Sequence, residues 1–185
     1  MNRTITVAAA AGVLTLSAIA LTGCSSPHSA GSRVELYDSV PALAADSSIV
    51  LSGIVQDQKT ANDIPGGSEF TLSTVEVSAT AKTDASHPAG STVVVRQHGS
   101  EGNPGPGAML EQGETYLLYL SPSGLDGDLA SQFSVTGGTA GVYETKQNTA
   151  ARNAAVTEST VFTKAPSDEG DDLPASLTLG DALKG

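Results

Sequence analysis

Short runs of apolar and β-branched residues, separated by turn-forming residues, fill the chain from Ser48 onward. Alternating apolar and polar positions rich in Val, Ile, Thr and Tyr are typical of strands. Strands are therefore predicted at Ser48–Gln56, Glu69–Ala81, Ser91–Gln97, Glu114–Ser121, Ser131–Gly137, Ala140–Thr145 and Ser159–Lys164. Gly137 and Gly138 predict a hairpin turn between the fifth and the sixth of these strands.

The second predicted strand changes its apolar face half-way along. Apolar side chains stand at even positions up to Leu72 and at odd positions from Val75 onward. Because the side chains of a strand alternate between two faces, we expect a bulge around Ser73 and Thr74 that keeps both groups on one face. Long bulged strands are typical of small barrels, which turn their corners in this way.

One short helix is predicted ahead of the strands. Ser39 is a suitable N-cap, and Pro41 lies in the first turn, where its missing N–H costs little. We therefore expect a helix over about 40–45.

Residues 33–165 are expected to form a single β domain, followed by an acidic tail at 166–185. Within the tail, Thr178 and Asp181 are placed like a capping box, which would open a short helix over 179–184. Short strands, turn signals between them and few aromatic residues predict a mainly β fold, a small antiparallel OB-like barrel or a sandwich.

The beginning of the chain has a different pattern. Arg3 is followed by a stretch from Ile5 to Leu21 without any charged residue. A basic start, an apolar middle and small residues at the end are typical of a secretion signal. As a helix the apolar stretch would reach roughly 25 Å, which is shorter than the roughly 30 Å hydrocarbon core of a bilayer. A signal peptide over 1–23 is therefore favoured over a permanent transmembrane span.

The segment Leu21-Thr22-Gly23-Cys24 resembles the lipobox of bacterial lipoproteins. The resemblance implies that the thiol of Cys24 is joined to a diacylglycerol and that signal peptidase II cuts between Gly23 and Cys24. The new amino group would be open to N-acylation, and residues 24–32, which are small and polar, would form a flexible tether. The membrane would then be a partner through the covalent lipid. The protein would be exported and anchored to the outer face of the cytoplasmic membrane, or to an outer membrane where the host has one.

Composition narrows the range of functions. Removing residues 1–23 leaves 162 of the 185 residues, with 8 Lys and Arg against 20 Asp and Glu, a formal charge of −12. Such a surface repels nucleic acid, which we therefore exclude as a partner, and favours a cationic one. Cys24 is the only cysteine, which excludes disulfides, cysteine-based zinc sites and thiol redox chemistry in the folded part.

The order of segments between Asp46 and Tyr143 looks like a family of small exported bacterial domains. The segments are "DSSIVLSGIV", a long strand, "STVVVRQ", a long Gly-rich loop, "GETYLLYL" and "FSVTGGTAGVY". In topology the order is also similar to the OB-like barrel of tissue inhibitors of metalloproteinases and netrins. Those inhibitors are stapled by disulfides and chelate a protease metal with a free N-terminal cysteine. Because Cys24 would be acylated and has no partner cysteine, the resemblance implies the barrel but not that inhibition.

The sequence contains no recognisable catalytic motif of a serine nucleophile. It has neither a Ser-x-x-Lys nor a Gly-x-Ser-x-Gly motif, which are signatures of serine nucleophiles. His98, Glu101 and Asn103 lie in or beside a Gly- and Pro-rich loop and are the candidate binding residues, because binding groups gather on loops held by a rigid sheet. His98 and Glu101 could also ligate a metal or act as an acid/base pair, but ordinary loop residues explain them more simply. We expect no cofactor and no metal.

These observations favour a lipid-anchored, non-enzymatic binding module of the cell envelope. Its contact surface would be formed by the loops after Gln56, His98 and Ser121. Its partner would be an envelope protein or a cationic molecule. The alternatives are an exported enzyme whose carboxylate pair is assembled only by folding, and a purely structural envelope protein. A filled barrel with grooves at its surface favours the binding module, whereas a close carboxylate pair with one raised pKa favours the enzyme.

Overall fold

A computed structural model describes residues 35–83, 86–145, 155–167 and 170–184. The α-helix is α1 (Val40–Asp46). The strands are β1 (Ile49–Ala61), β2 (Phe70–Lys82), β3 (Thr92–Ser100), β4 (Asn103–Pro104), β5 (Thr115–Pro122), β6 (Phe133–Val135), β7 (Val142–Glu144), β8 (Val161–Lys164) and β9 (Ser176–Thr178). Three short 3-10 turns complete the described elements, η1 (Gly127–Ser131), η2 (Gly138–Gly141) and η3 (Leu179–Asp181).

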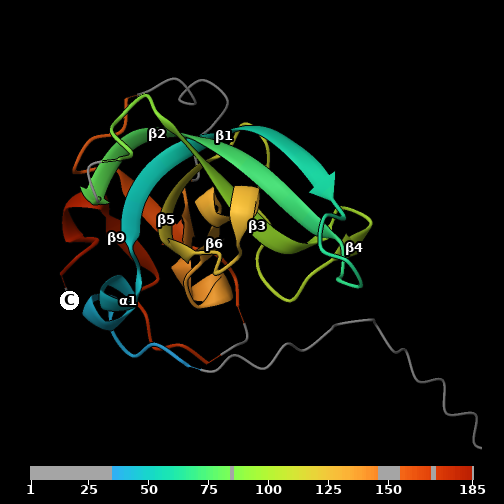
Figure 1. Cartoon of the computed structure of the whole chain (residues 1–185). Helices are drawn as coiled ribbons and strands as arrows, with labels where there is room; N and C mark the ends of the chain where they lie inside the picture. The colour runs from blue at the N-terminus through green and yellow to red at the C-terminus, as the bar shows by residue number, and fades with distance from the viewer. Residues whose placement is uncertain (1–34, 84–85, 146–154, 168–169, 185) are drawn as a thin grey trace, which may run out of the picture.

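Five strands close into a barrel in the order β1, β2, β3, β6, β5 and back to β1. The pairing of β3 with β6 is parallel, and the other pairings in the ring are antiparallel. Closure depends on the length of β1, which pairs with β2 along one edge and with β5 along the other (Figure 1). The fold is therefore mainly β and a small OB-like barrel, which is one of the two architectures that the sequence leaves open.

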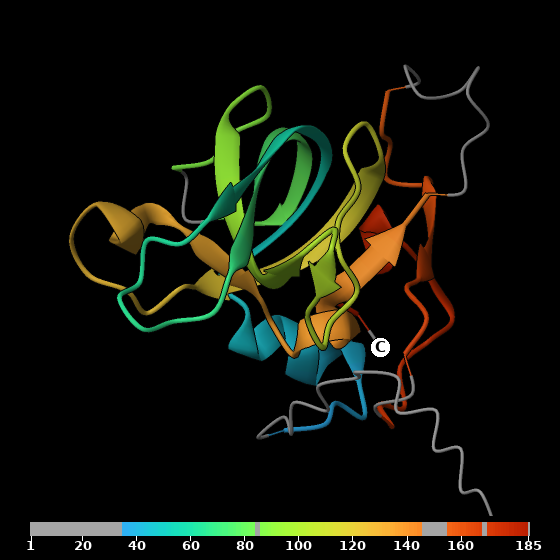
Figure 2. The same ribbon diagram turned by 90° about the vertical axis from the view of Figure 1, so that its right-hand side faces the viewer.

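Two layers of apolar side chains hold the barrel together. One layer fills the barrel interior, with Ile49, Leu51, Val95 and Leu118 almost completely buried. The second layer lies between the outside of the barrel and the segments that cover it, α1 and the pair β8–β9 (Figure 2). Because β5 contributes to both layers, its residues from 115 to 120 are all buried. This explains the continuous apolar run that made β5 the clearest strand in the sequence.

The packed domain continues beyond residue 165, where we expected it to end. Strand β9 pairs with β8, and Leu177, Leu179 and Ala182 are buried in the outer apolar layer. The expected cap is present, because the backbone N–H of Asp181 donates to Thr178 Oγ1 at 3.2 Å. It opens the single 3-10 turn η3 rather than the short α-helix expected over 179–184.

The expected bulge at Ser73 and Thr74 is wrong. Pairing between β2 and β3 is regular there, and the extra residue opposite Val75 and Thr74 lies on β1, at Gln56. The extra residues of β2 itself lie further along the strand, at Ser78 and Ala81. The apolar side chains of β2 serve both faces of the strand. Val75 and Val77 point into the barrel, whereas Phe70 packs on the outside beneath Arg96, whose guanidinium lies 4.7 Å from the ring centre.

The predicted hairpin at Gly137 and Gly138 is also wrong. Both β6 and β7 pair with the same edge of β5, and they are not paired with each other. The two glycines have φ of 64° and 58° and begin the loop between β6 and β7. These two strands lie one after the other along the same edge of β5. A Cβ atom at Gly137 would lie 2.6 Å from the ring of Tyr37. The Tyr37 ring therefore packs closely against this loop.

Within the described residues, no helix has both the length and the apolar character needed to cross a bilayer. The segment 1–34, with the signal peptide, the cleavage position and Cys24, lies outside the described residues.

Candidate functional site

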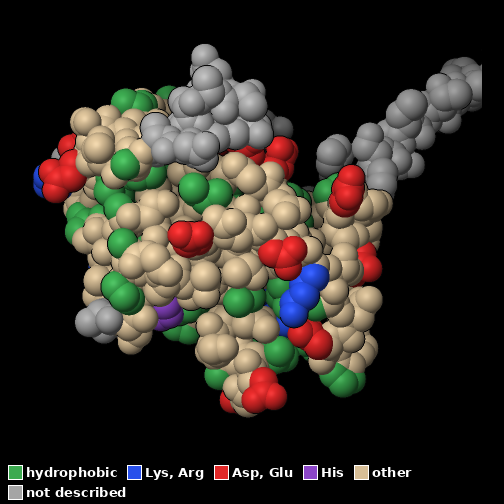
Figure 3. All heavy atoms as spheres, turned by 90° about the horizontal axis from the view of Figure 1, so that it is seen from above, with side chains coloured by type: hydrophobic (Ala, Val, Ile, Leu, Met, Phe, Trp, Pro, Cys, Tyr) green, Lys and Arg blue, Asp and Glu red, His purple; other side chains and the backbone are tan. Residues whose placement is uncertain are grey.

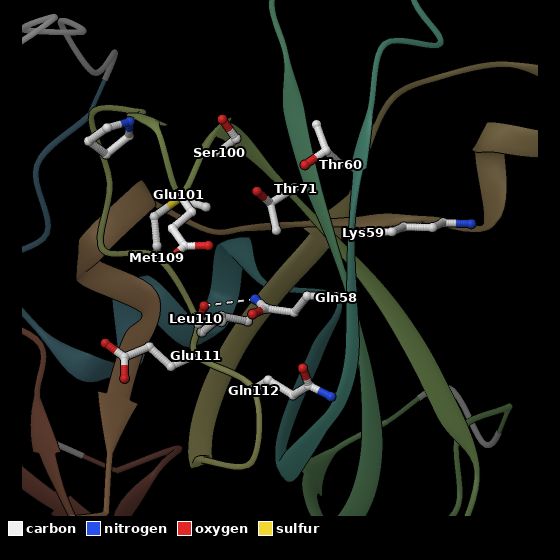
Figure 4. Close-up of a pocket in the computed structure, with 11 residues that line it drawn as sticks. Gln58, Lys59, Thr60, Thr71, Ser100, Glu101, Met109, Leu110, Glu111 and Gln112 are labelled. Atoms are coloured by element: carbon white, nitrogen blue, oxygen red, sulfur yellow. Dashed lines mark hydrogen bonds between the residues drawn. The ribbon is translucent and has the colours of Figure 1, made fainter.

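A groove of about 590 Å³ lies at one end of the barrel. One wall is the end of β1 with residues Gln58, Lys59 and Thr60, and the other wall is the loop segment 109–112 (Figure 4). Thr71 of β2 lies between the walls. We call this hollow the barrel-end groove.

The bulge at Gln56 opens this groove. Up to Ile54, β1 pairs with β5, and the last backbone contacts join Val55 to Glu114 and Gly113 at 3.1 and 2.8 Å. Beyond the bulge the two chain segments separate, because an extra residue bends a strand and increases its twist. The gap between them is the groove.

Two glutamines that point toward the barrel interior hold the loop wall in place. Gln97 acts like a strand partner, because its side chain donates to the carbonyl of Ala108 at 2.7 Å and accepts from the N–H of Leu110 at 3.0 Å. Gln58 donates to the carbonyl of Leu110 at 2.8 Å and to Ser73 Oγ at 2.9 Å. The loop is therefore tied to two strands and forms a defined wall.

Tyr116 adds a third tie to the loop. Its hydroxyl accepts a hydrogen bond of 2.9 Å from the N–H of Glu111. Burial raises the pKa of Tyr116 to about 12, so the hydroxyl is protonated near neutral pH. Buried tyrosines elsewhere follow the same rule, since desolvation also raises the pKa of Tyr119 and that of Tyr143.

Close packing of the loop against β3 depends on two glycines. A side chain at Gly99 would meet Gly105 N at 2.2 Å, and one at Gly105 would meet the carbonyl oxygen of His98 at 2.0 Å. The Gly- and Pro-rich composition of this segment therefore serves a close approach of two backbones. Thr71 Oγ1 donates to the carbonyl of Gly99 at 2.8 Å and fixes the same turn to β2.

The charged side chains that line the groove point in different directions. Figure 4 shows Glu101 pointing into the groove, while Lys59 points away from it and Glu111 is turned away from Glu101. Of these three charged side chains, only that of Glu101 faces the groove. On the face drawn in Figure 3, acidic side chains are spread over the surface and Lys and Arg are few.

A second polar cluster, centred on Arg96, joins two loops on the outer face of β2 and β3. Arg96 donates from Nη1 and Nη2 to Asp63 at 2.9 and 2.5 Å, and from Nε to Gln132 Oε1 at 2.6 Å. Asp63 belongs to the loop after β1 and Gln132 to the loop after β5. The hydrogen bond from Arg96 lowers the pKa of Asp63. Because three guanidinium nitrogens are engaged, this cluster fixes loop positions.

The three candidate residues from the sequence line hollows on the two sides of the β3–β4 hairpin. Glu101 lines the barrel-end groove. Asn103 and His98 line a neighbouring hollow of about 420 Å³, and His98 also borders a small one of about 130 Å³. The His98 ring packs against the Phe70 ring, with 4.4 Å between the ring centres, and His98 Nδ1 lies 3.3 Å from Ser68 Oγ. The structure thus gathers the three residues around one hairpin but does not bring them into one pocket.

Sequence reasoning missed Gln58, Gln97 and Arg96. Their only signal is a polar side chain at the end of an apolar run, as in "STVVVRQ", and such residues usually mark the point where a strand becomes exposed. Here Gln97 points toward the interior and Arg96 is 5% exposed on the outer face. Among the described residues, no group of His, Asp and Glu is placed to hold a metal ion.

No known family model matches this chain, and no curated protein matches its sequence. Any functional conclusion therefore depends on the residues of the chain and on their geometry.

Proposed function

We propose that this protein is a lipid-anchored binding module on the outer face of a bacterial membrane, and that it contacts its partner through the barrel-end groove. The anchor would be a diacylglycerol joined to Cys24, with the polypeptide beginning at that residue after removal of 1–23. The partner would be an envelope protein or another molecule that carries positive charge.

Two features of the sequence support the anchor. The uncharged stretch of 5–21 ends directly before Leu21-Thr22-Gly23-Cys24, and the thiol is the nucleophile that a thioether needs. Each buried methylene contributes about 0.8 kcal/mol, so two acyl chains supply on the order of 20 kcal/mol and hold the protein on the membrane. The formal charge of −12 would repel anionic headgroups and favour a domain held in solvent.

The observation that carries the binding role is the barrel-end groove itself. Its volume of about 590 Å³ falls within the roughly 300–1,000 Å³ of ligand sites, while the barrel interior is filled by apolar side chains. The loop wall is tied to β1 and β3 by side-chain hydrogen bonds and is therefore pre-organised, which reduces the entropy cost of binding.

Site-specific photo-crosslinking in living cells tests this function. A photoreactive amino acid at Thr60 or Met109, both lining the groove, should capture the same partner in the full chain. The matched control is Val161, a 58% exposed residue of β8, which should not capture it. Charge reversal by Glu101→Arg should abolish the capture from Thr60, since a cationic partner would then be repelled.

The proposed binding role is contradicted if the groove positions and Val161 give the same products, or if no specific product forms at Thr60 and Met109. Capture that survives Glu101→Arg would contradict the cationic character of the partner and leave the groove as the site.

A further inference from the structure

Among the described parts of the chain, no strand pairs with one edge of β1 over its last residues. Along its other edge, β1 pairs with β2 as far as Ala61 opposite Phe70. On the groove side β5 pairs only from Ile49 to Ile54. Within the described residues no strand takes over this edge from 57 to 61, which therefore borders the barrel-end groove.

An unpaired edge offers hydrogen bonds to another chain. In an antiparallel ladder, alternate residues direct their N–H and C=O groups to each of the two sides. Residues 57–61 therefore present part of their backbone groups to the groove. A segment of five residues spans about 17 Å, long enough for an extended peptide to pair along it by strand addition.

The groove side of this edge lacks the usual protection. Proteins commonly block an exposed edge with a Lys side chain or a bulge. The bulge at Gln56 lies before the free segment, and Figure 4 shows the side chain of Lys59 directed away from the groove. Gln58 is tied to Leu110 and Ser73 and lies on the side of the barrel interior, as a floor of the groove.

Charge indicates which peptide fits. Glu101 points into the groove from the wall opposite β1 (Figure 4). The chain from Cys24 onward has a formal charge of −12, which raises the local concentration of cations and repels acidic segments. Thr60, Thr71 and Ser100 add neutral polar lining.

We propose that the edge of β1 at residues 57–61 binds an extended, Lys- or Arg-containing peptide segment of another protein as an additional strand, with a cationic side chain facing Glu101. The inference rests on the proposed function and names the chemistry of the partner at the same groove.

Fluorescence anisotropy with defined peptides tests this inference, using the full lipidated chain in detergent micelles. The probe is a labelled nine-residue peptide of sequence TKVKTKVKT. A second probe has the same sequence and charge but carries backbone N-methyl groups along both edges, which removes its ability to pair as a strand. A third, TEVETEVET, reverses the charge. Hydrogen exchange of residues 57–61 is measured with and without each peptide.

The basic peptide should bind and slow the amide exchange of 57–61. The N-methylated peptide should bind at least about tenfold more weakly, and the acidic peptide should not compete. Because Glu101 is exposed, Glu101→Gln should weaken binding of the basic peptide by about two- to fivefold, the range of one exposed ion pair. The matched control Asp38→Asn, at an exposed residue ahead of α1 and outside the groove lining, should leave it unchanged.

Equal binding of the plain and the N-methylated peptide would overturn the strand-addition proposal. So would a dimer in light scattering without peptide whose formation protects 57–61, because a second copy would then occupy the edge. If no basic peptide binds while Thr60 and Met109 still capture a partner in cells, the inference fails and the binding function stands. If neither result is obtained, both fail.

Discussion

Replacing Gln97 by Leu removes the two hydrogen bonds that hold the loop wall of the groove while keeping a side chain of similar size. Gln97 bonds the backbone of Ala108 and Leu110 at 2.7 and 3.0 Å, and both bonds are partly buried. Each is worth about 1 kcal/mol net, and each backbone group left without a partner adds to the loss. We therefore expect Gln97→Leu to lower the free energy of unfolding by about 2–3 kcal/mol.

Urea and thermal unfolding of the full chain measure this loss. For a domain of this size, it corresponds to a fall in Tm of roughly 5–10 °C. The control is Gln112→Leu, which removes one exposed hydrogen bond to the carbonyl of Gln56 and should cost about 0.5 kcal/mol or less. A Gln97→Leu loss no larger than that of Gln112→Leu would refute the idea that Gln97 holds the loop.

Three further substitutions test the ion pair of Asp63 and the two buried tyrosine hydroxyls. Because the hydrogen bond from Arg96 lowers the pKa of folded Asp63, its contribution to stability is full above the unfolded pKa of about 4 and is lost as the pH falls through the lowered folded value. Asp63→Asn should therefore destabilise the protein at pH 7, with a difference from wild type that shrinks at acid pH in urea titrations; a constant difference would contradict this. The Tyr143 hydroxyl is buried with no hydrogen-bond partner in the described structure, whereas that of Tyr119 donates to Ala182 at 2.8 Å. Unfolding experiments should thus find Tyr143→Phe neutral or stabilising and Tyr119→Phe destabilising by about 1 kcal/mol, and the reverse order would show that these contacts are misassigned.

Local sequence pattern predicts the long strands of the barrel, but neither the closure of the sheet nor the face on which each side chain lies. The runs that became β1, β2, β3 and β5 are visible in the sequence because half-buried and fully buried strands select β-branched and apolar residues. The side on which Phe70 lies depends on Arg96, a residue of another strand that covers it. A pattern within one strand cannot contain that information, so Phe70 was assigned to the wrong face.

The insertion between β6 and β7 illustrates a related limit. Gly137 and Gly138 were correctly identified as turn residues, and both have positive φ. A local signal does not specify whether the chain returns to pair with itself. Here β6 and β7 both pair with β5. This pairing depends on contacts between residues far apart in the sequence.

Only one residue of the candidate site could be predicted from the sequence. The Gly- and Pro-rich loop pointed to Glu101, which lines the groove. The free edge of β1 could not be predicted, because it results from where β5 stops pairing and from the bulge at Gln56. Gln97 lay in an apolar run and gave no hint that its amide binds a loop more than ten residues away.

The intact mass of the protein isolated from its own cells tests the proposed tether to the membrane. We expect a polypeptide that begins at Cys24 and carries the added mass of a diacylglycerol, alone or with a further acyl chain on its amino group. A chain that begins at Met1, or one in which Cys24 keeps a free thiol, would contradict it.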